Sequence, residues 1–92
     1  MSIITLDLSA VRTAKDFHKT LKEKLGFPEF YGMNWDAFWD AITGLVELPD
    51  EIQIFGWDNV MEHLPDEAAI FQEIFVRFSI EYPMLKCKLL FE

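Results

Sequence analysis

The sequence has little cysteine, little positive charge and no long hydrophobic run. Its single cysteine, Cys87, excludes an intramolecular disulfide and a cysteine-based metal site, and its strand-like neighbours predict a small core residue. No apolar stretch approaches the roughly 20 residues of a membrane span. The brief apolar run at residues 2–7 has no basic segment before it, unlike a signal peptide. We therefore expect a cytoplasmic protein that does not bind membranes.

Positive charge is scarce, and it is absent from the middle of the chain. Eight basic residues against sixteen acidic ones give a formal charge of −8, which disfavours nucleic acid as a partner and favours a basic protein. Solubility alone is the alternative explanation, as is neutralisation of the acidic region by the basic residues of segment 12–24. No lysine or arginine occurs in residues 25–76, which hold eleven acids: Glu29, Asp36, Asp40, Glu47, Asp50, Glu51, Asp58, Glu62, Asp66, Glu67 and Glu73.

What the sequence does contain is enough apolar material for one folded domain, expected to span residues 1–92. Of the 92 residues 51% are hydrophobic, a composition typical of a globular chain. The order of the patterns predicts an α/β fold with a small three-stranded parallel sheet packed with about four helices. Strands are expected at residues 3–8, 51–55 and 85–91, and helices at about 14–25, 34–44, 58–64 and 65–82.

Helix boundaries are marked by residues that favour helix ends. Thr13 followed by Asp16 resembles a capping box, and Gly26 marks the end of that helix. Asn34 is a good N-cap, Gly44 a good C-terminal stop, and Pro65 suits a first helical position.

The helix predicted at residues 34–44 has two different faces. Successive residues turn by roughly 100°, so Asp36 and Asp40 lie one turn apart on an acidic face opposite the apolar one. Such a pair is commonly a solvated surface, and an acid/base site or a nonspecific cation site are further interpretations. The nearby aromatic and small residues favour a protein-binding patch instead; they are Phe30, Tyr31, Gly32, Trp39 and Gly44.

Other catalytic or ligand-binding patterns are missing. His18 and His63 are 45 positions apart, and we interpret both as surface or cap residues rather than ligands. The sequence has no Ser-His-Asp arrangement, no glycine-rich phosphate loop and no basic patch with interleaved aromatic residues. We therefore expect no cofactor, no metal and no catalytic residue.

Residues 25–49, LGFPEFYGMNWDAFWDAITGLVELP, resemble the central segment of the barstar family of ribonuclease inhibitors. The specific elements are Pro-Glu-aromatic-Tyr-Gly-x-Asn-x-Asp-Ala-x-Trp-Asp, then Thr-Gly and Val-Glu. The resemblance implies a barstar-like fold and a monomeric, non-enzymatic immunity protein that blocks a basic barnase-like ribonuclease. It implies that Asp40 occupies a substrate phosphate position, that Asp36 pairs with nearby cations, and that Phe30 packs on a catalytic histidine. The implied partner-binding residues are Phe30, Tyr31, Gly32, Asn34, Asp36, Trp39, Asp40, Thr43, Gly44, Leu45, Val46 and Glu47.

The sequence also departs from the family pattern. Phe30 replaces a tyrosine, Met33 replaces an acid and Leu45 replaces a tryptophan. The family contributes a glutamate from its last helix, and here Glu73 and Glu81 are both candidates. Two other functions therefore stay open: a barstar-fold adaptor for a basic partner that is not a nuclease, and a small hydrolase using the two aspartates.

Overall fold

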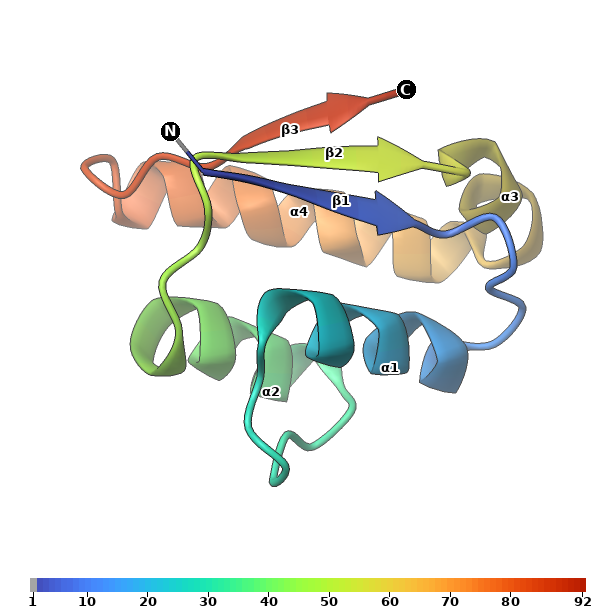
Figure 1. The fold of residues 1–92 in the computed structure, drawn as a ribbon, viewed down its shortest axis with the longest axis horizontal. Coiled ribbons are helices and arrows are strands. Elements are labelled where there is room, and N and C mark those ends of the chain that lie inside the picture. The colour runs from blue at the N-terminus through green and yellow to red at the C-terminus, as the bar shows by residue number, and fades with distance from the viewer. Residues whose placement is uncertain (1) are drawn as a thin grey trace.

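The computed structural model describes residues 2–92, and its framework is a parallel sheet of three strands (Figure 1). The strands are β1 (Ile3–Asp7), β2 (Glu51–Phe55) and β3 (Lys88–Phe91), in the order β1-β2-β3. In the register of the sheet Leu6 pairs with Ile54, which in turn pairs with Phe91. The predicted α/β fold with a three-stranded parallel sheet is confirmed.

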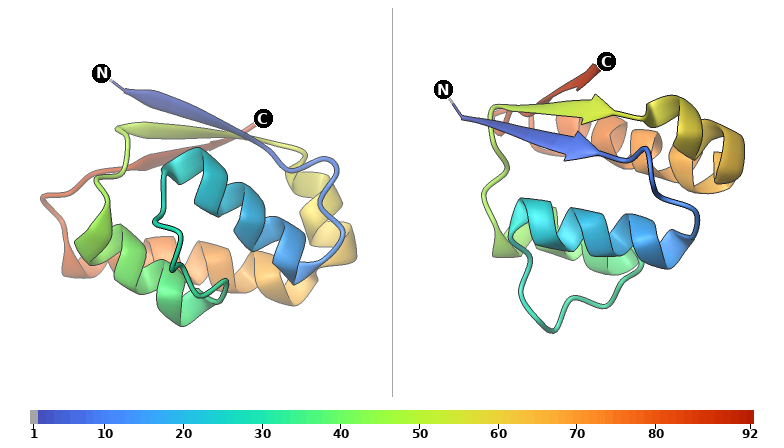
Figure 2. Two further views of the ribbon diagram at one scale, coloured as in Figure 1. Left: turned by 60° about the horizontal axis from the view of Figure 1, so that its bottom comes forward. Right: turned by 45° about the vertical axis from the view of Figure 1, so that its right-hand side comes forward.

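The helices lie mainly on one side of this sheet (Figure 2). They are α1 (Ala14–Leu25), α2 (Trp35–Asp40), the π-helical turn η1 (Ala41–Leu45), α3 (Trp57–His63) and α4 (Pro65–Glu81). The strands alternate accordingly, with buried residues facing the helices and partly or fully exposed ones on the other side. No helix within residues 2–92 combines the length and the apolar character that crossing a membrane requires.

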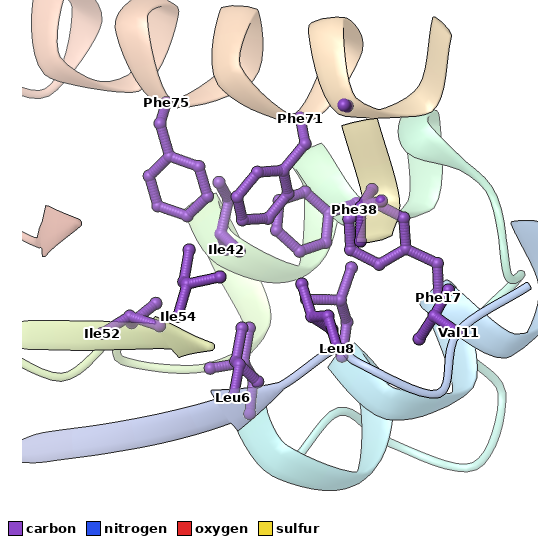
Figure 3. Close-up of a cluster of buried hydrophobic side chains, with 14 of the residues drawn as sticks. Leu6, Leu8, Val11, Phe17, Phe38, Ile42, Ile52, Ile54, Phe71 and Phe75 are labelled. Atoms are coloured by element: carbon purple, nitrogen blue, oxygen red, sulfur yellow. The ribbon is translucent and has the colours of Figure 1, made fainter. Parts of the chain in front are cut away.

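The core lies between the sheet and the helices, and it fixes the position of α2 (Figure 3). Phe38 is fully buried, with its ring centre 5.9 Å from that of Phe71 and 6.0 Å from that of Phe75, both on α4. Ile42 of η1 is buried in the same cluster. Burying such side chains contributes about 1.5–3 kcal/mol each, so α2 is held firmly against α4 by one apolar face.

The helix starts follow the capping residues that the sequence indicates. The Thr13 hydroxyl accepts a hydrogen bond from the Asp16 amide at 3.1 Å, and the Asp16 carboxylate accepts a bond from the Arg12 amide at 3.4 Å. The Asn34 side chain accepts a bond from the Ala37 amide at 2.7 Å, which begins α2 at Trp35. Gly26 ends α1 with a φ of 71°.

Two element boundaries differ from those predicted. The last strand begins at Lys88 rather than at Leu85, because residues 82–85 form a turn closed by a bond from the Leu85 amide to the Tyr82 carbonyl. Pairing starts only where the Lys88 amide donates to the Asp50 carbonyl, at 2.8 Å. The helix predicted for residues 34–44 is α-helical only to Asp40, and it then widens into η1.

Candidate partner-binding face

The two aspartates of α2 are the central feature of the surface formed by residues 30–47, which we call the α2 face. Asp36 and Asp40 are exposed and lie four residues apart on one side of the helix. Neither carboxylate makes a hydrogen bond or an ion pair with any of residues 2–92. Their acceptor oxygens are therefore free for groups outside the chain, at the cost of a small mutual repulsion.

The loop before α2 is tightly constrained although it lies at the surface. The Asn34 amide nitrogen donates to the Gly32 carbonyl at 3.1 Å. A Cβ at Gly32 would lie 3.2 Å from that nitrogen and 3.3 Å from Cβ of Ala37, so a larger residue would push the loop away from the helix. Met33 has a φ of 56°, a left-handed conformation that few residues other than glycine adopt. The loop is thus held in one shape rather than left free.

Phe30 and Tyr31 are adjacent in the sequence but differ completely in exposure. Phe30 is 75% exposed and projects its ring from the loop, whereas Tyr31 is only 6% exposed. The Tyr31 hydroxyl lies 2.7 Å from Nδ1 of His18 and donates to the Asn34 carbonyl at 3.3 Å. Of the two aromatic residues, only Phe30 offers its ring to a partner, and Tyr31 anchors the loop from beneath.

A buried histidine supports this anchor, contrary to the prediction that His18 is a surface or cap residue. His18 is 2% exposed, and its ring centre lies 4.3 Å from that of Trp35. Burial lowers the pKa of His18, and the nearby Glu67 carboxylate raises it by a smaller amount. Burial also raises the pKa of Tyr31. Both groups are therefore neutral near pH 7, as a hydrogen-bonded pair inside an apolar core requires.

Glu67 is held by the same cluster. Nε1 of Trp35 donates a hydrogen bond to the Glu67 carboxylate at 2.6 Å, which joins the start of α2 to the start of α4. The face of α2 that points inward is therefore fixed by one polar contact as well as by the core.

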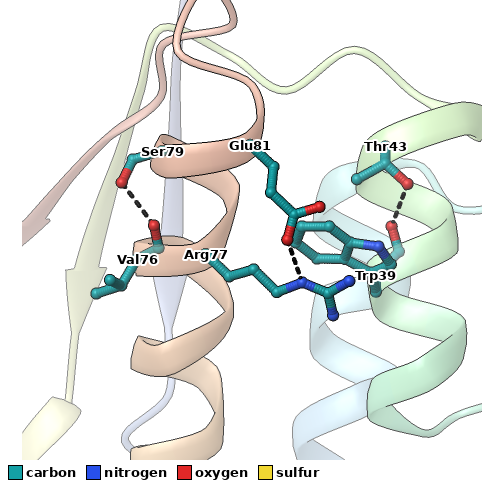
Figure 4. Close-up of polar contacts among 6 residues, drawn as sticks. All are labelled: Trp39, Thr43, Val76, Arg77, Ser79 and Glu81. Atoms are coloured by element: carbon teal, nitrogen blue, oxygen red, sulfur yellow. Dashed lines mark hydrogen bonds and ion pairs between the residues drawn. The ribbon is translucent and has the colours of Figure 1, made fainter.

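Trp39 is half-buried and connects the other end of α2 to α4 (Figure 4). Its ring centre lies 6.5 Å from that of Phe78 and 6.1 Å from that of Tyr82. The Arg77 guanidinium lies over the ring, with Cζ 3.9 Å from the ring centre, and its Nε donates to the Glu81 carboxylate at 2.6 Å. Of the two candidate glutamates on the last helix, Glu81 is thus the one joined to the α2 face through Arg77.

The π-helical turn η1 forms the other end of the α2 face. Thr43 donates its hydroxyl to the Trp39 carbonyl at 2.7 Å, and the Val46 amide closes the turn on the Ala41 carbonyl at 3.0 Å. Gly44, Leu45 and Glu47 are exposed, and Val46 is half-buried.

A cavity of about 610 Å³ separates this turn from the loop before β3. Cys87 lines it, and burial followed by the nearby Asp50 raises the pKa of this thiol to about 11. Cys87 therefore stays protonated near pH 7 and has little nucleophilic character. Asp36 and Asp40 do not line the cavity, so it does not enclose the paired carboxylates as an acid/base site requires. No group of three His, Cys, Asp or Glu side chains within residues 2–92 could hold a metal ion.

Comparison with known proteins agrees with this geometry. The profile of the family described as Barstar (barnase inhibitor) matches residues 1–90. The chain belongs to the barstar family. It is also 45% identical over 49 residues to the putative ribonuclease inhibitor YrdF of Bacillus subtilis (strain 168). That alignment covers 53% of this chain and 54% of the relative, so it spans about half of each protein.

Barstar-family membership places the chain in a family of inhibitors, and the α2 face coincides with the segment that resembles the family in sequence. Of the expected residues, the structure brings Asp36, Asp40, Phe30 and the exposed part of η1 to the surface. It places Tyr31 in the core and packs Trp39 against α4.

Three residues of the α2 surroundings were not found from sequence: His18, Glu67 and Arg77. His18 could have been recognised, since it lies three and seven residues before Leu21 and Leu25, on the apolar side of α1. The other two carry no such local signal.

Proposed function

We propose that the chain is an inhibitor that binds and blocks the active site of a basic, barnase-type ribonuclease. The observation that supports this most is the pair of exposed carboxylates of Asp36 and Asp40, which have no partner among residues 2–92. A carboxylate presents two acceptor oxygens to a guanidinium, as a phosphate does. Two carboxylates fixed one helical turn apart can therefore replace substrate phosphates among the cations of such an enzyme.

The charge distribution supports fast association with a basic enzyme. The chain carries a formal charge of −8, and residues 25–76 contain no lysine or arginine. A field of this sign accelerates encounter with a positively charged active site, and the acceleration decreases as salt screens it.

Phe30 supports a second kind of contact. Its exposed ring projects from a loop whose shape is fixed by Tyr31 and Asn34, so little conformational freedom is lost when it packs against a partner. In the proposed complex the Phe30 ring covers a catalytic histidine, and the flanking turn, from Thr43 to Glu47, borders the contact. The inhibitor acts in the cytoplasm as an immunity protein, before the ribonuclease is exported, and performs no chemistry itself.

The test is inhibition of RNA cleavage by a barnase-type ribonuclease, titrated with the protein at low salt and at 150 mM salt. Asp40→Ala is compared with Glu62→Ala, which removes an equally exposed acid of α3 that has no side-chain hydrogen bond. Truncating one partner of a buried charge pair typically costs about 2–5 kcal/mol, a range partly measured on barnase and barstar themselves. We therefore expect Asp40→Ala to weaken inhibition at least about thirtyfold, and Glu62→Ala to change it little at 150 mM salt.

Equal losses from both variants would contradict phosphate replacement and leave only general electrostatic attraction. No inhibition by the folded wild-type protein would contradict the ribonuclease proposal itself. The alternative function is then that of an adaptor for a basic protein that is not a nuclease.

A further inference from the structure

One cation borders the acidic α2 face, and its position is fixed. Arg77 is the only lysine or arginine from residue 25 to residue 85. It reaches from α4 to α2, where its guanidinium covers the ring of Trp39 and its Nε is bound to Glu81 (Figure 4). Trp39 itself lies between Asp36 and Asp40 in the sequence, so a positive group stands beside the two carboxylates.

This guanidinium is held on one side and free on the other. The Arg77 side chain is 57% exposed, and neither of its terminal nitrogens makes a hydrogen bond within residues 2–92. Because a guanidinium has five N–H donors and Nε uses one, four donors remain available. Stacking on Trp39 and pairing with Glu81 orient these donors in advance, so that binding them costs little additional side-chain entropy.

A fixed cation at an interface affects which partners can bind. When water is removed from its free donors, they need acceptors on the partner, and a facing lysine or arginine adds repulsion. Glu81 only partly offsets this, since it occupies one donor and leaves the outer edge of the guanidinium open.

We propose that Arg77 determines specificity among ribonucleases, and that the preferred enzyme presents an acidic side chain where it meets the α4 border of the α2 face. This inference rests on the proposed ribonuclease-binding function and adds the chemistry of the partner at one position. A partner that places a cation at this position binds more weakly, although the rest of the α2 face attracts it.

The test uses a barnase-type ribonuclease and a panel of its variants, in each of which one lysine or arginine bordering the active site is replaced by glutamate. Dissociation constants are measured at 150 mM salt for the wild-type inhibitor, Arg77→Gln and Arg77→Lys. We expect one enzyme variant to gain affinity for the wild-type inhibitor, and this gain to fall at least about tenfold with Arg77→Gln. Arg77→Lys should keep part of the gain, because it retains the charge but not the planar donor arrangement.

Lys88→Gln is the matched control, since it removes the same charge from an exposed residue of β3, in the sheet rather than on α4. It should leave the gain unchanged. If the affinities of the wild type and Arg77→Gln keep the same ratio across the whole panel, Arg77 has only a structural role and the inference is overturned. Failure of the proposed function gives a different result, in which the wild-type inhibitor binds no member of the panel.

Discussion

Nδ1 of His18 and Oη of Tyr31 lie 2.7 Å apart in the core, and this contact joins α1 to the loop that precedes α2. The Tyr31 hydroxyl also reaches the Asn34 carbonyl, 3.3 Å away, where α2 begins. A buried pair of polar groups therefore holds the loop that presents Phe30. The stability of the protein and the shape of its proposed binding surface depend on the same hydrogen bonds.

The buried His18 predicts a loss of stability in mild acid. Burial holds the folded-state pKa of His18 below its ordinary value of 6.5, so the unfolded chain takes up a proton at higher pH than the folded chain does. Stability is complete above pH 6.5 and decreases as the pH falls through 6.5 towards the lower folded-state pKa. Urea unfolding measured between about pH 7.5 and 5.5, above the range where most carboxylates titrate, should show this decrease.

Two histidine variants test this assignment. His18→Gln should remove most of the decrease between those pH values, although it lowers stability at every pH. His63→Gln replaces the exposed histidine at the end of α3 and should retain the decrease. A slope that survives in His18→Gln would mean that another group is responsible.

Tyr31→Phe should destabilise the fold and weaken partner binding together. The change removes only the hydroxyl, which leaves Nδ1 of His18 and the Asn34 carbonyl without this partner. A buried polar group left unpaired costs about 1–3 kcal/mol. Urea unfolding gives the first effect, and inhibition of a barnase-type ribonuclease gives the second. Unchanged stability would show that water or a neighbouring group replaces the hydroxyl.

Phe30→Ala should separate the two effects, because the Phe30 ring is exposed and packs little within the chain. We expect the free energy of unfolding to change by less than about 0.5 kcal/mol, as for most surface substitutions. Binding should weaken by about 2 kcal/mol, the scale of an aromatic contact at the centre of an interface. Wild-type inhibition by this variant would exclude the Phe30 ring from the interface.

The order of the elements could be predicted from sequence because its signals are local. Asn34, Gly26 and Pro65 act on the backbone within a few residues, so their effects do not depend on the rest of the fold. The site could be located for a similar reason: one continuous segment contains Phe30, Asp36 and the turn that follows. Its resemblance to the barstar family was therefore visible without any tertiary information.

The contacts that support the site could not be predicted, because they join distant parts of the chain. Arg77 meets Trp39 only when α4 packs beside α2, and Glu67 meets Trp35 by the same packing. The different exposures of Phe30 and Tyr31 likewise depend on the position of His18 on another helix. Sequence neighbours share a loop, but the core decides which of them faces solvent.

Gly56→Ala should be far more costly than the same change at Gly26. Both glycines have left-handed backbones, with φ of 76° and 71°. A Cβ at Gly26 meets nothing within 4 Å, so only the conformational cost of about 1–2 kcal/mol applies. A Cβ at Gly56 would lie 2.6 Å from Cα of Ser9, where the segment after β1 passes the start of α3. Thermal unfolding of the two variants compares them, and equal losses would contradict a steric role for Gly56.

Asp40→Asn should raise stability slightly while it lowers inhibition. Asp40 has no ionic partner within residues 2–92 and lies one turn from Asp36, so neutralising it removes a repulsion worth about 0.2–0.5 kcal/mol. The substitution preserves shape, and the core contacts of Phe38 and Ile42 are unaffected. A charge that weakens the isolated fold is useful only if a partner compensates for it. Urea unfolding and ribonuclease inhibition by the same variant should therefore change in opposite directions, and a loss in both would indicate that Asp40 stabilises the fold.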